Sequence, residues 1–479
     1  MQMPRDIGPF HIIGIGGIGM SAIAEILVAK GYTVQGSDQK ESANVKRLRA
    51  KGIRVFVGHD AVNLIGARYV VISTAVKAAN PELAAARSRG LQIIRRAEML
   101  AELMRLYSTV SVTGTHGKTT TTSLLSHIFA EAGQEPTVIT GGIINSWGSN
   151  ARLGQGKWMI VEADESDGTF TRLPTEIGIV TNIDPEHLDY FGSVEAMHHE
   201  YEAFLKNIPF FGLAVVCIDH PVVRAMVERL NLRSDGRRLL TYGTSNDADI
   251  MLENVRVDGS TTTFDATLSA SVKGGSRKLE GWVVPIPGQH NALNALAAIA
   301  VATEAGIEDS KIHDAMAAFS GVKRRFQLTG EWNGVTIYDD YGHHPAEISA
   351  VLSAARAGAK GSVIAIVEPH RYTRVRDLFS EFSACFKDAD SVIVGPLYTA
   401  GESPIDGIDS NSLAQGIRDT GHRSVEVAGA PADLASAIKR LAKPNDTVVC
   451  LGAGMSTDWA HALPDWLAGH KPGETGTDV

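Results

Sequence analysis

One short loop, Gly114-Thr115-His116-Gly117-Lys118-Thr119-Thr120, carries the residue types that bind nucleotide phosphates. It stands between a run of residues with strand propensity and a sequence with helical periodicity, so backbone N–H groups and a helix N-terminus would point at phosphate oxygens. We expect Lys118 to reach the terminal phosphate and the Thr119 hydroxyl to bind Mg²⁺. The first glycine of the general phosphate-loop pattern is replaced by Val112. The alternative interpretation is a glycine-rich turn with a surface lysine.

Two later apolar runs end in acidic segments. Glu162 begins EADESD, and His187 lies in NIDPEHLD. The carboxyl ends of parallel strands meet at one edge of a sheet, so Glu162 and His187 could converge near the phosphates as metal ligands. Either segment taken alone is more typical of a solvated helix start. The phosphate loop in the same module favours the metal site.

A second glycine-rich loop lies near the start of the chain. Gly14, Gly16 and Gly19 have the spacing G-x-G-x-x-G with Gly17 among them, and Asp38 ends the next strand candidate. This is the fingerprint of a dinucleotide site, and its geometry serves any pyrophosphate, including that of a nucleotide sugar. NAD is therefore one candidate ligand, a nucleotide sugar is another, and a plain tight turn is the structural alternative.

The rest of the chain offers further polar candidates. Asn291 and Asn294 are three apart on one helical face and, read alone, cap that helix. Arg324 and Arg325 are either surface charge or a phosphate clamp. Two charged loops that follow strand candidates suggest a carboxylate-binding site or solvated loops, and they hold Asp339, Asp340, Tyr341, His343, His344, Glu368, His370, Arg371 and Arg374.

These residues need a scaffold, and the pattern predicts α/β structure. Short apolar strands alternate with amphipathic helices along most of the chain, which is typical of parallel sheets. The alternation restarts twice and predicts three modules, residues 1–106, 107–321 and 322–479. Polar/apolar alternation from about Ala248 to Pro285, with a turn at Asp258-Gly259, predicts an antiparallel appendage in the second module.

Composition excludes several classes of protein. The 479 residues carry 45 basic and 54 acidic side chains, a net charge of -9, so no nucleic-acid partner is expected. The three cysteines, Cys217, Cys385 and Cys450, lie far apart in apolar runs, which favours buried thiols in the cytoplasm. Apolar runs are too short to span a bilayer, so no membrane insertion is expected.

Ten segments of the chain resemble the motifs of the Mur ligases. In chain order they are HIIGIGGIGMSAIAEIL, GTHGKTTTT, EADESDGTF, HLDYFGS, PGQHNALNA, KRRF, DDYGHHPAE, PHRYTR, YTAGE and GAG. The resemblance runs from about His11 to Trp459. It implies an N-terminal Rossmann-like domain for a UDP-sugar, a central P-loop ATPase-like domain, and a C-terminal Rossmann-like domain for an amino acid.

The resemblance also implies roles for single residues. Lys118 and Thr119 match the phosphate-loop pair, and Glu162 and His187 match the second magnesium site. The other matches are Gly14, Gly16, Gly17, Gly19 and Asp38 for the UDP-sugar; Asn291 and Asn294 on the adenine side; Arg325 as a nucleotide clamp; Asp340 at the ribose; and Tyr341, His370, Arg371 and Arg374 around the amino acid.

The motifs are most similar to the alanine-adding branch of the family. That branch implies ATP and Mg²⁺ as cofactors, UDP-N-acetylmuramate and L-alanine as substrates, and an acyl phosphate on the way to a peptidoglycan precursor. His343 or His344 would take the proton of the attacking amine. The segment after HLD contains no lysine before Lys206, where several Mur ligases carry a carbamylated one, and Met455-Ser456 follow GAG without an implied role.

Three other functions fit part of the pattern. A related murein-peptide ligase would add a preformed peptide and share every catalytic residue. An NAD-dependent oxidoreductase would use the N-terminal glycine loop but leave the phosphate loop and the acidic segments unexplained. A nucleotide-responsive binding module would use the phosphate loop without releasing phosphate.

Overall fold

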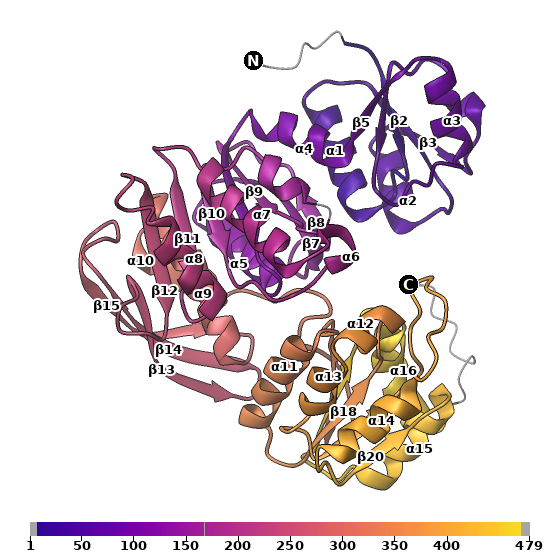
Figure 1. Cartoon of the computed structure of the whole chain (residues 1–479), viewed down its shortest axis with the longest axis vertical. Helices are drawn as coiled ribbons and strands as arrows, with labels where there is room; N and C mark the ends of the chain where they lie inside the picture. The colour runs from indigo at the N-terminus through magenta and orange to yellow at the C-terminus, as the bar shows by residue number, and fades with distance from the viewer. Residues whose placement is uncertain (1–6, 167, 471–479) are drawn as a thin grey trace. The chain divides into compact units, whose positions relative to one another are not determined.

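The computed structural model describes residues 7–166 and 168–470. The chain divides into two compact units. The first unit comprises Met1–Glu253, Ala266–Glu280 and Leu293–Phe319, and the second comprises Asn254–Asp265, Gly281–Ala292 and Ser320–Val479. The described residues form β-sheets of five, ten and six strands, with helices packed beside them (Figure 1). No helix in the described ranges combines the length and apolar character needed to span a bilayer.

The five-stranded sheet is parallel and has the order β3-β2-β1-β4-β5. Along β1, Ile12 shares a core with α1, whereas Ile13 shares a core with α3, so helices cover both faces. The elements are β1 (Phe10–Ile13), α1 (Ile18–Ala29), β2 (Val34–Asp38), α2 (Ala43–Ala50), β3 (Arg54–Val57), η1 (Ala61–Leu64), β4 (Tyr69–Ile72), α3 (Pro81–Ser88), β5 (Gln92–Arg95) and α4 (Arg96–Met104).

The ten-stranded sheet has the order β15-β14-β13-β12-β11-β10-β6-β9-β7-β8. Its strands are β6 (Ser108–Thr113), β7 (Thr137–Ile144), β8 (Ser149–Arg152), β9 (Trp158–Glu162), β10 (Ile177–Val180), β11 (Leu213–Cys217), β12 (Arg238–Gly243), β13 (Ile250–Asp258), β14 (Thr261–Leu268) and β15 (Arg277–Val284). Its helices are α5 (Lys118–Glu131), η2 (Thr169–Arg172), α6 (Leu188–Phe191), α7 (Val194–Asn207), α8 (Pro221–Leu230), α9 (Gln289–Glu304) and α10 (Asp309–Ala317).

Most of this sheet is parallel, from β12 through β11, β10, β6 and β9 to β7, and β8 pairs antiparallel with β7. The neighbours β13 and β14 are joined by Gly259 and Ser260 alone. So short a connection requires an antiparallel pair, which confirms the predicted appendage. Because β10, β6 and β9 are adjacent and parallel, the segments that follow them emerge at the same edge of the sheet.

The six-stranded sheet has the order β16-β17-β21-β18-β19-β20 and is parallel except at β16, which pairs antiparallel with β17. Its elements are β16 (Gln327–Trp332), β17 (Val335–Asp340), α11 (Pro345–Gly358), β18 (Val363–Val367), α12 (Tyr372–Asp377), α13 (Phe379–Ala384), β19 (Ser391–Val394), α14 (Ser410–Asp419), β20 (Val425–Val427), α15 (Pro431–Leu441), β21 (Thr447–Leu451) and α16 (Ser456–Ala468).

Alternation along β18 explains why that strand is wholly apolar. Val363, Ala365 and Val367 belong to a core shared with α11, α13 and α14, whereas Ile364 and Ile366 belong to a second core with α15 and α16. A parallel sheet covered on both faces needs apolar residues at every position.

The predicted alternation of short strands and helices is present, and the structure adds the strands β7, β8, β12 and β16, which the sequence patterns do not predict. The strands β8 and β16 are polar; β8 ends its sheet beside β7, and β16 ends the six-stranded sheet. The three cysteines are buried free thiols, as predicted.

Candidate active site

The phosphate loop leaves the carboxyl end of β6 and runs into the N-terminus of α5. Gly114 has φ +127° and Gly117 has φ +81°. A Cβ at Gly114 would lie 2.1 Å from Thr181 Oγ1, and one at Gly117 would lie 2.6 Å from Asn294 Oδ1. Both positions therefore need glycine for conformation and for space. The loop ends where helix N–H groups and the helix dipole favour an anion.

Residues that follow β10 fix the shape of this loop. The backbone N–H of His116 donates to Asn182 Oδ1 at 2.7 Å, and Thr181 Oγ1 donates to the His116 carbonyl at 2.6 Å. Thr115 Oγ1 accepts from the Asp184 N–H at 2.9 Å. Thr181 and Asn182 hold the loop through these bonds, a role that the sequence pattern of this segment does not predict.

Asp184 also joins two histidines. Its carboxylate lies 3.1 Å from His116 Nε2 and 3.2 Å from Nε2 of His220, the residue before α8. Burial raises the pKa of Asp184, but the hydrogen bonds from His116 and His220 outweigh it and hold this pKa well below its usual range. An ionised Asp184 thus orients the histidine of the phosphate loop.

Lys118 is held by a buried acid. Its Nζ donates to Glu165 Oε1 at 2.7 Å and to the carbonyls of Gly114 and Thr115 at 2.6 and 3.0 Å. Burial raises the pKa of Glu165 to about 7, although Lys118 opposes the shift. Burial lowers the pKa of Lys118, but Glu165 and the neighbouring acids outweigh it, so Lys118 stays protonated. Glu165 lies within the EADESD segment, but its position there does not predict this contact with Lys118.

Glu162 ends β9 beside the first turn of α5. Thr119 Oγ1 donates to Glu162 Oε1 at 2.9 Å, and Thr140 Oγ1 donates to Glu162 Oε2 at 3.0 Å. The hydroxyl and carboxylate oxygens predicted to bind Mg²⁺ are therefore adjacent. Hard oxygen donors of this kind are the ligands that Mg²⁺ prefers.

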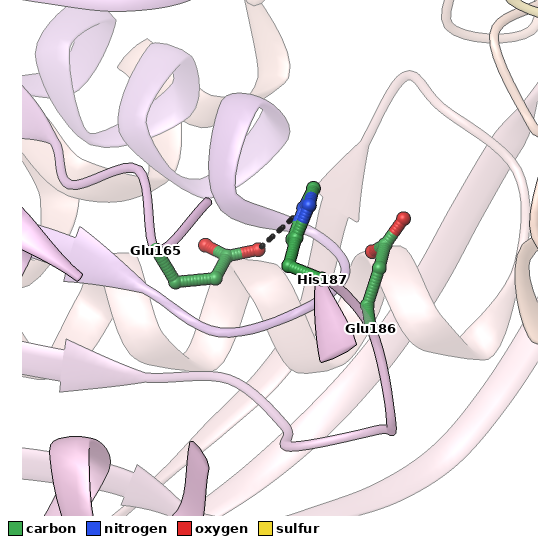
Figure 2. A group of neighbouring side chains, drawn as sticks. All are labelled: Glu165, Glu186 and His187. Atoms are coloured by element: carbon green, nitrogen blue, oxygen red, sulfur yellow. Dashed lines mark ion pairs between the residues drawn. The ribbon is translucent and has the colours of Figure 1, made fainter. Parts of the chain in front are cut away.

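His187 belongs to a different group, formed with Glu165 and Glu186 (Figure 2). One ligand atom from each of the three lies within 4.8 Å of the others, and His187 Nε2 is 4.0 Å from Glu165 Oε1. His187 has φ +55° and precedes α6. Glu162 is not a member of this group. Asp167, the last acid of the EADESD segment, lies outside the described residues.

The asparagines at the start of α9 are buried. Asn294 lies against Gly117 of the phosphate loop. Asn291 Nδ2 donates to the Pro287 carbonyl at 2.7 Å, which ties the helix start to the preceding turn.

The N-terminal glycine loop follows β1 in the five-stranded sheet. Gly14 has φ +73°, and the Gly16 N–H donates to Asp38 Oδ2 at 2.9 Å. A Cβ at Gly16 would lie 2.8 to 2.9 Å from side-chain atoms of α2, its cap and Asp38. A hollow of about 800 Å³ opens beside this loop and is lined by Gly14, Gly17, Gly19, Asp38, His59, Lys77 and Arg96, among others.

Arg96 and Gly19 also line a second hollow of about 210 Å³, whose other walls include Glu162 and Asp164. Arg96 Nη2 lies 3.6 Å from Asp164 Oδ2. A ligand that extends from the N-terminal glycine loop past Arg96 would therefore reach the carboxylate of Glu162, which lies beside Thr119 of the phosphate loop.

The second unit carries the later candidates. Asp340 ends β17 and accepts from the backbone N–H groups of Phe326 and Gly342, each at 2.7 Å. Burial raises the pKa of Asp340 to about 6. The guanidinium groups of Arg324 and Arg325 lie 4.6 and 5.2 Å from the centre of the Tyr341 ring.

The two histidines after Tyr341 differ in surroundings. His344 is buried, and its Nδ1 accepts from the Ala346 N–H at 3.2 Å as the N-cap of α11. His343 packs edge-on against Tyr341 and His370, with ring centres 5.1 and 5.5 Å apart. The sequence H-P-x-E at the start of α11 is the signal that could have identified His344 as a cap.

The loop after β18 holds the remaining predicted residues. Arg374 Nη1 lies 3.0 Å from His370 Nδ1, and the His370 ring stacks on Tyr398 with 5.4 Å between ring centres. Burial lowers the pKa of His370 to about 3, so its ring is neutral and Nδ1 can accept from Arg374. Arg371 Nε donates to Glu402 Oε1 at 2.6 Å. The structure thus brings His343, His370, Arg371 and Arg374 into one cluster.

Comparison with protein families gives three matches. The Mur ligase family catalytic domain matches residues 9–108, the Mur ligase middle domain matches 112–302, and the Mur ligase glutamate ligase domain matches 324–454. The UDP-N-acetylmuramate–L-alanine ligases of Azorhizobium caulinodans and Bradyrhizobium sp. are 57% and 56% identical over 467 residues, which is 98% of this chain and 99% of each relative.

Solved structures agree. The UDP-N-acetylmuramate-alanine ligase of Thermotoga maritima superposes with a TM-score of 0.78 at 26% identity, covering 97% of this chain and all of that one. A MurF ligase from Thermotoga maritima in complex with ADP shares the fold, with a TM-score of 0.60 at 18% identity, covering 86% of this chain and 94% of that one. The predicted three-domain α/β fold is confirmed, and with three family domains matched along most of its length the chain belongs to the Mur ligase family.

Proposed function

We propose that this chain joins L-alanine to UDP-N-acetylmuramate at the expense of ATP, through an acyl phosphate, to make a peptidoglycan precursor. The observation that carries the proposal is the full-length likeness to ligases named for these two substrates. The site chemistry supports it, since a hollow beside the pyrophosphate-type glycine loop and a hollow beside Glu162 share Arg96.

The reaction needs two steps because a carboxylate is a poor electrophile. A carboxylate oxygen of UDP-N-acetylmuramate attacks the γ-phosphorus of ATP, and ADP leaves. The amine of L-alanine then attacks the acyl carbon, and the tetrahedral intermediate expels inorganic phosphate. Lys118 offsets the charge that develops on the transferred phosphoryl group, and the backbone of Gly114–Thr120 holds the phosphates.

Thr119 and Glu162 are the residues that we assign to a magnesium ion at the ATP phosphates. We assign His187, together with Glu165 and Glu186, to a second ion, because ligand atoms of these three residues lie within 4.8 Å of one another. Glu162, which the resemblance pairs with His187 at the second magnesium site, is not a member of this group. When bound, Mg²⁺ supplies Lewis-acid stabilisation of the phosphoryl oxygens. On the family resemblance we assign Asn291 and Asn294 to the adenine side, Arg325 to the phosphates and Asp340 to the ribose.

For the amine proton we favour His343 over His344. The Nδ1 atom of His344 accepts the capping hydrogen bond of α11, whereas His343 shares a ring cluster with Tyr341 and His370. Glu347 Oε2 lies 3.4 Å from His343 Nδ1, close enough to stabilise a protonated imidazole.

Arg371 and Arg374 are the candidates for binding the carboxylate of L-alanine. A guanidinium fork matches a carboxylate with two parallel hydrogen bonds, and lysine does not reproduce that geometry. We expect Arg374→Lys and Arg371→Lys each to raise the alanine KM tenfold or more, with little change in the ATP KM. A tenfold change corresponds to about 1.4 kcal/mol of binding free energy. Steady-state kinetics checks this. An alanine KM that neither variant changes would place the carboxylate elsewhere, with Tyr341 and His370 the next residues to substitute.

Gly16 tests the assignment of the N-terminal loop. Its Cβ position is crowded by α2 and Asp38, and a pyrophosphate bound there would approach the backbone closely. We expect Gly16→Val to weaken UDP-N-acetylmuramate binding by at least about tenfold and to leave ATP binding unchanged. Calorimetry with each nucleotide measures both. A fall in ATP affinity with sugar-nucleotide affinity intact would exchange the two sites.

Phosphate release with varied acceptors tests the whole proposal. The purified chain, ATP and UDP-N-acetylmuramate should release phosphate with L-alanine and not with a preformed peptide. Faster release with the peptide would identify a peptide-adding ligase, and no release with any acceptor would leave a nucleotide-binding module. A change in nicotinamide fluorescence on mixing with NADH would instead favour the oxidoreductase. The buried free thiols support a cytoplasmic location for the enzyme.

A further inference from the structure

We infer that Glu402, in the YTAGE segment, is a positioning residue that orients Arg371 toward the carboxylate of the amino acid. The inference rests on the proposed function, since it takes Arg371 and Arg374 to face that carboxylate. Glu402 follows β19 by eight residues in sequence and lies on a different loop from the arginines.

The carboxylate of Glu402 accepts three hydrogen bonds from the loop that begins α12. Arg371 Nε donates at 2.6 Å, Thr373 Oγ1 donates at 2.7 Å to the same oxygen, and the Thr373 N–H donates at 3.0 Å to the other. The Glu402 side chain is 17% exposed. Its carboxylate therefore binds both the arginine and the first turn of the helix that carries Arg374.

The backbones of the two loops are tied as well. The Arg371 N–H donates to the Tyr398 carbonyl at 2.9 Å, and the Tyr398 N–H donates to the Pro369 carbonyl at 2.8 Å. Arg371 itself has φ +68°, a conformation that non-glycine residues adopt only where their surroundings impose it. The bonds to Tyr398 and Glu402 supply those surroundings.

The charge of Glu402 distinguishes a positioning role from a purely electrostatic one. Burial raises the pKa of Glu402, but the hydrogen bonds from Thr373 and Arg371 outweigh it and lower the pKa to about 2, so the group is ionised at neutral pH. An ionised carboxylate close to an anion-binding arginine weakens the attraction for a second carboxylate. Glu402 instead orients Arg371, because a hydrogen bond at Nε fixes the guanidinium plane and directs the edge formed by its two Nη atoms.

Arg374 is oriented in a parallel way. Its Nη1 meets His370 Nδ1, and His370 is held by stacking on Tyr398, the first residue of the YTAGE segment. One loop thus supports both arginines, Arg371 through Glu402 and Arg374 through Tyr398 and His370.

The direction in which Glu402→Gln changes the alanine KM distinguishes a positioning role from a simple electrostatic effect. If Glu402 positions Arg371, Glu402→Gln should raise the alanine KM about tenfold, because a charge-assisted hydrogen bond is lost, with kcat and the ATP KM within about twofold of the parent. If Glu402 is only a nearby negative charge, its removal should lower the alanine KM. An unchanged or lower alanine KM therefore overturns the inference.

Two further variants complete the test. Thr373→Val removes one donor to Glu402 without altering either charge, and it should raise the alanine KM by a smaller factor; it decides the question if Glu402→Gln does not fold. Glu426→Gln, which breaks an exposed arginine–glutamate pair with Arg440 in the same unit, is the matched control and should change nothing. If the Arg371 and Arg374 lysine variants leave the alanine KM unchanged, the proposed amino-acid site fails; if they raise it and Glu402→Gln does not, only this inference fails.

Discussion

Replacing Lys118 with alanine is expected to lower kcat about a thousandfold, because phosphoryl transfer depends on charge stabilisation at the transferred group. Lys118 is the first residue of α5, and its ammonium group already lies at the mouth of the phosphate loop, bonded to two loop carbonyls and to Glu165. Phosphate release with all three substrates present measures the loss.

The same substitution removes the cation beside a buried acid. An unpaired buried carboxylate costs several kcal/mol unless it takes up a proton, and Glu165, with a pKa of about 7, does so readily. We therefore expect Lys118→Ala to lower Tm only slightly and Lys118→Ala/Glu165→Gln to restore Tm without restoring turnover. Near-normal kcat in the single variant would remove the phosphate-loop assignment.

Glu162→Ala is expected to raise the Mg²⁺ concentration needed for half-maximal rate about a hundredfold, because it removes a carboxylate from the ion's ligand set. This expectation rests on the 2.9 Å distance between Glu162 Oε1 and Thr119 Oγ1. His187→Ala should raise the magnesium requirement as well, through the second ion. A magnesium titration of the initial rate measures both variants.

An exposed acid provides the control for that titration. Glu195→Ala removes an exposed carboxylate in the first turn of α7 that is not a member of the Glu165–Glu186–His187 group, and it should leave the titration unchanged. Unchanged magnesium dependence in Glu162→Ala and His187→Ala would show that these side chains lie in solvated segments at the end of β9 and after β10 and bind no magnesium.

The sequence patterns predicted the features that depend on residues close together in the chain. The strand β18 is a continuous apolar run because helices cover both faces of its sheet, and the phosphate loop has glycines where backbone angle and space require them. The bounds of the three modules stay a prediction, as do the roles of the site residues. The polar edge strands β8 and β16 escaped the pattern because nothing buries both of their faces.

The residues that support the site were not predictable in the same way. Glu165 lies 47 positions from Lys118, and Glu402 lies 31 positions from Arg371. No spacing rule connects such pairs, because the sheet order decides which loops meet. Asn182 is a similar case, since its contact with His116 exists only because β10 and β6 are neighbours.

In the proposed reaction, ATP activates the carboxylate of UDP-N-acetylmuramate before the amine attacks. UDP-N-acetylmuramate labelled with ¹⁸O in both carboxylate oxygens tests it directly, since the oxygen that attacks the γ-phosphorus must leave with the phosphate. After turnover with ATP and L-alanine, mass spectrometry should find one ¹⁸O in each inorganic phosphate and one in the amide carbonyl of the product. Unlabelled phosphate accompanying a product that keeps its label would contradict the acyl-phosphate account.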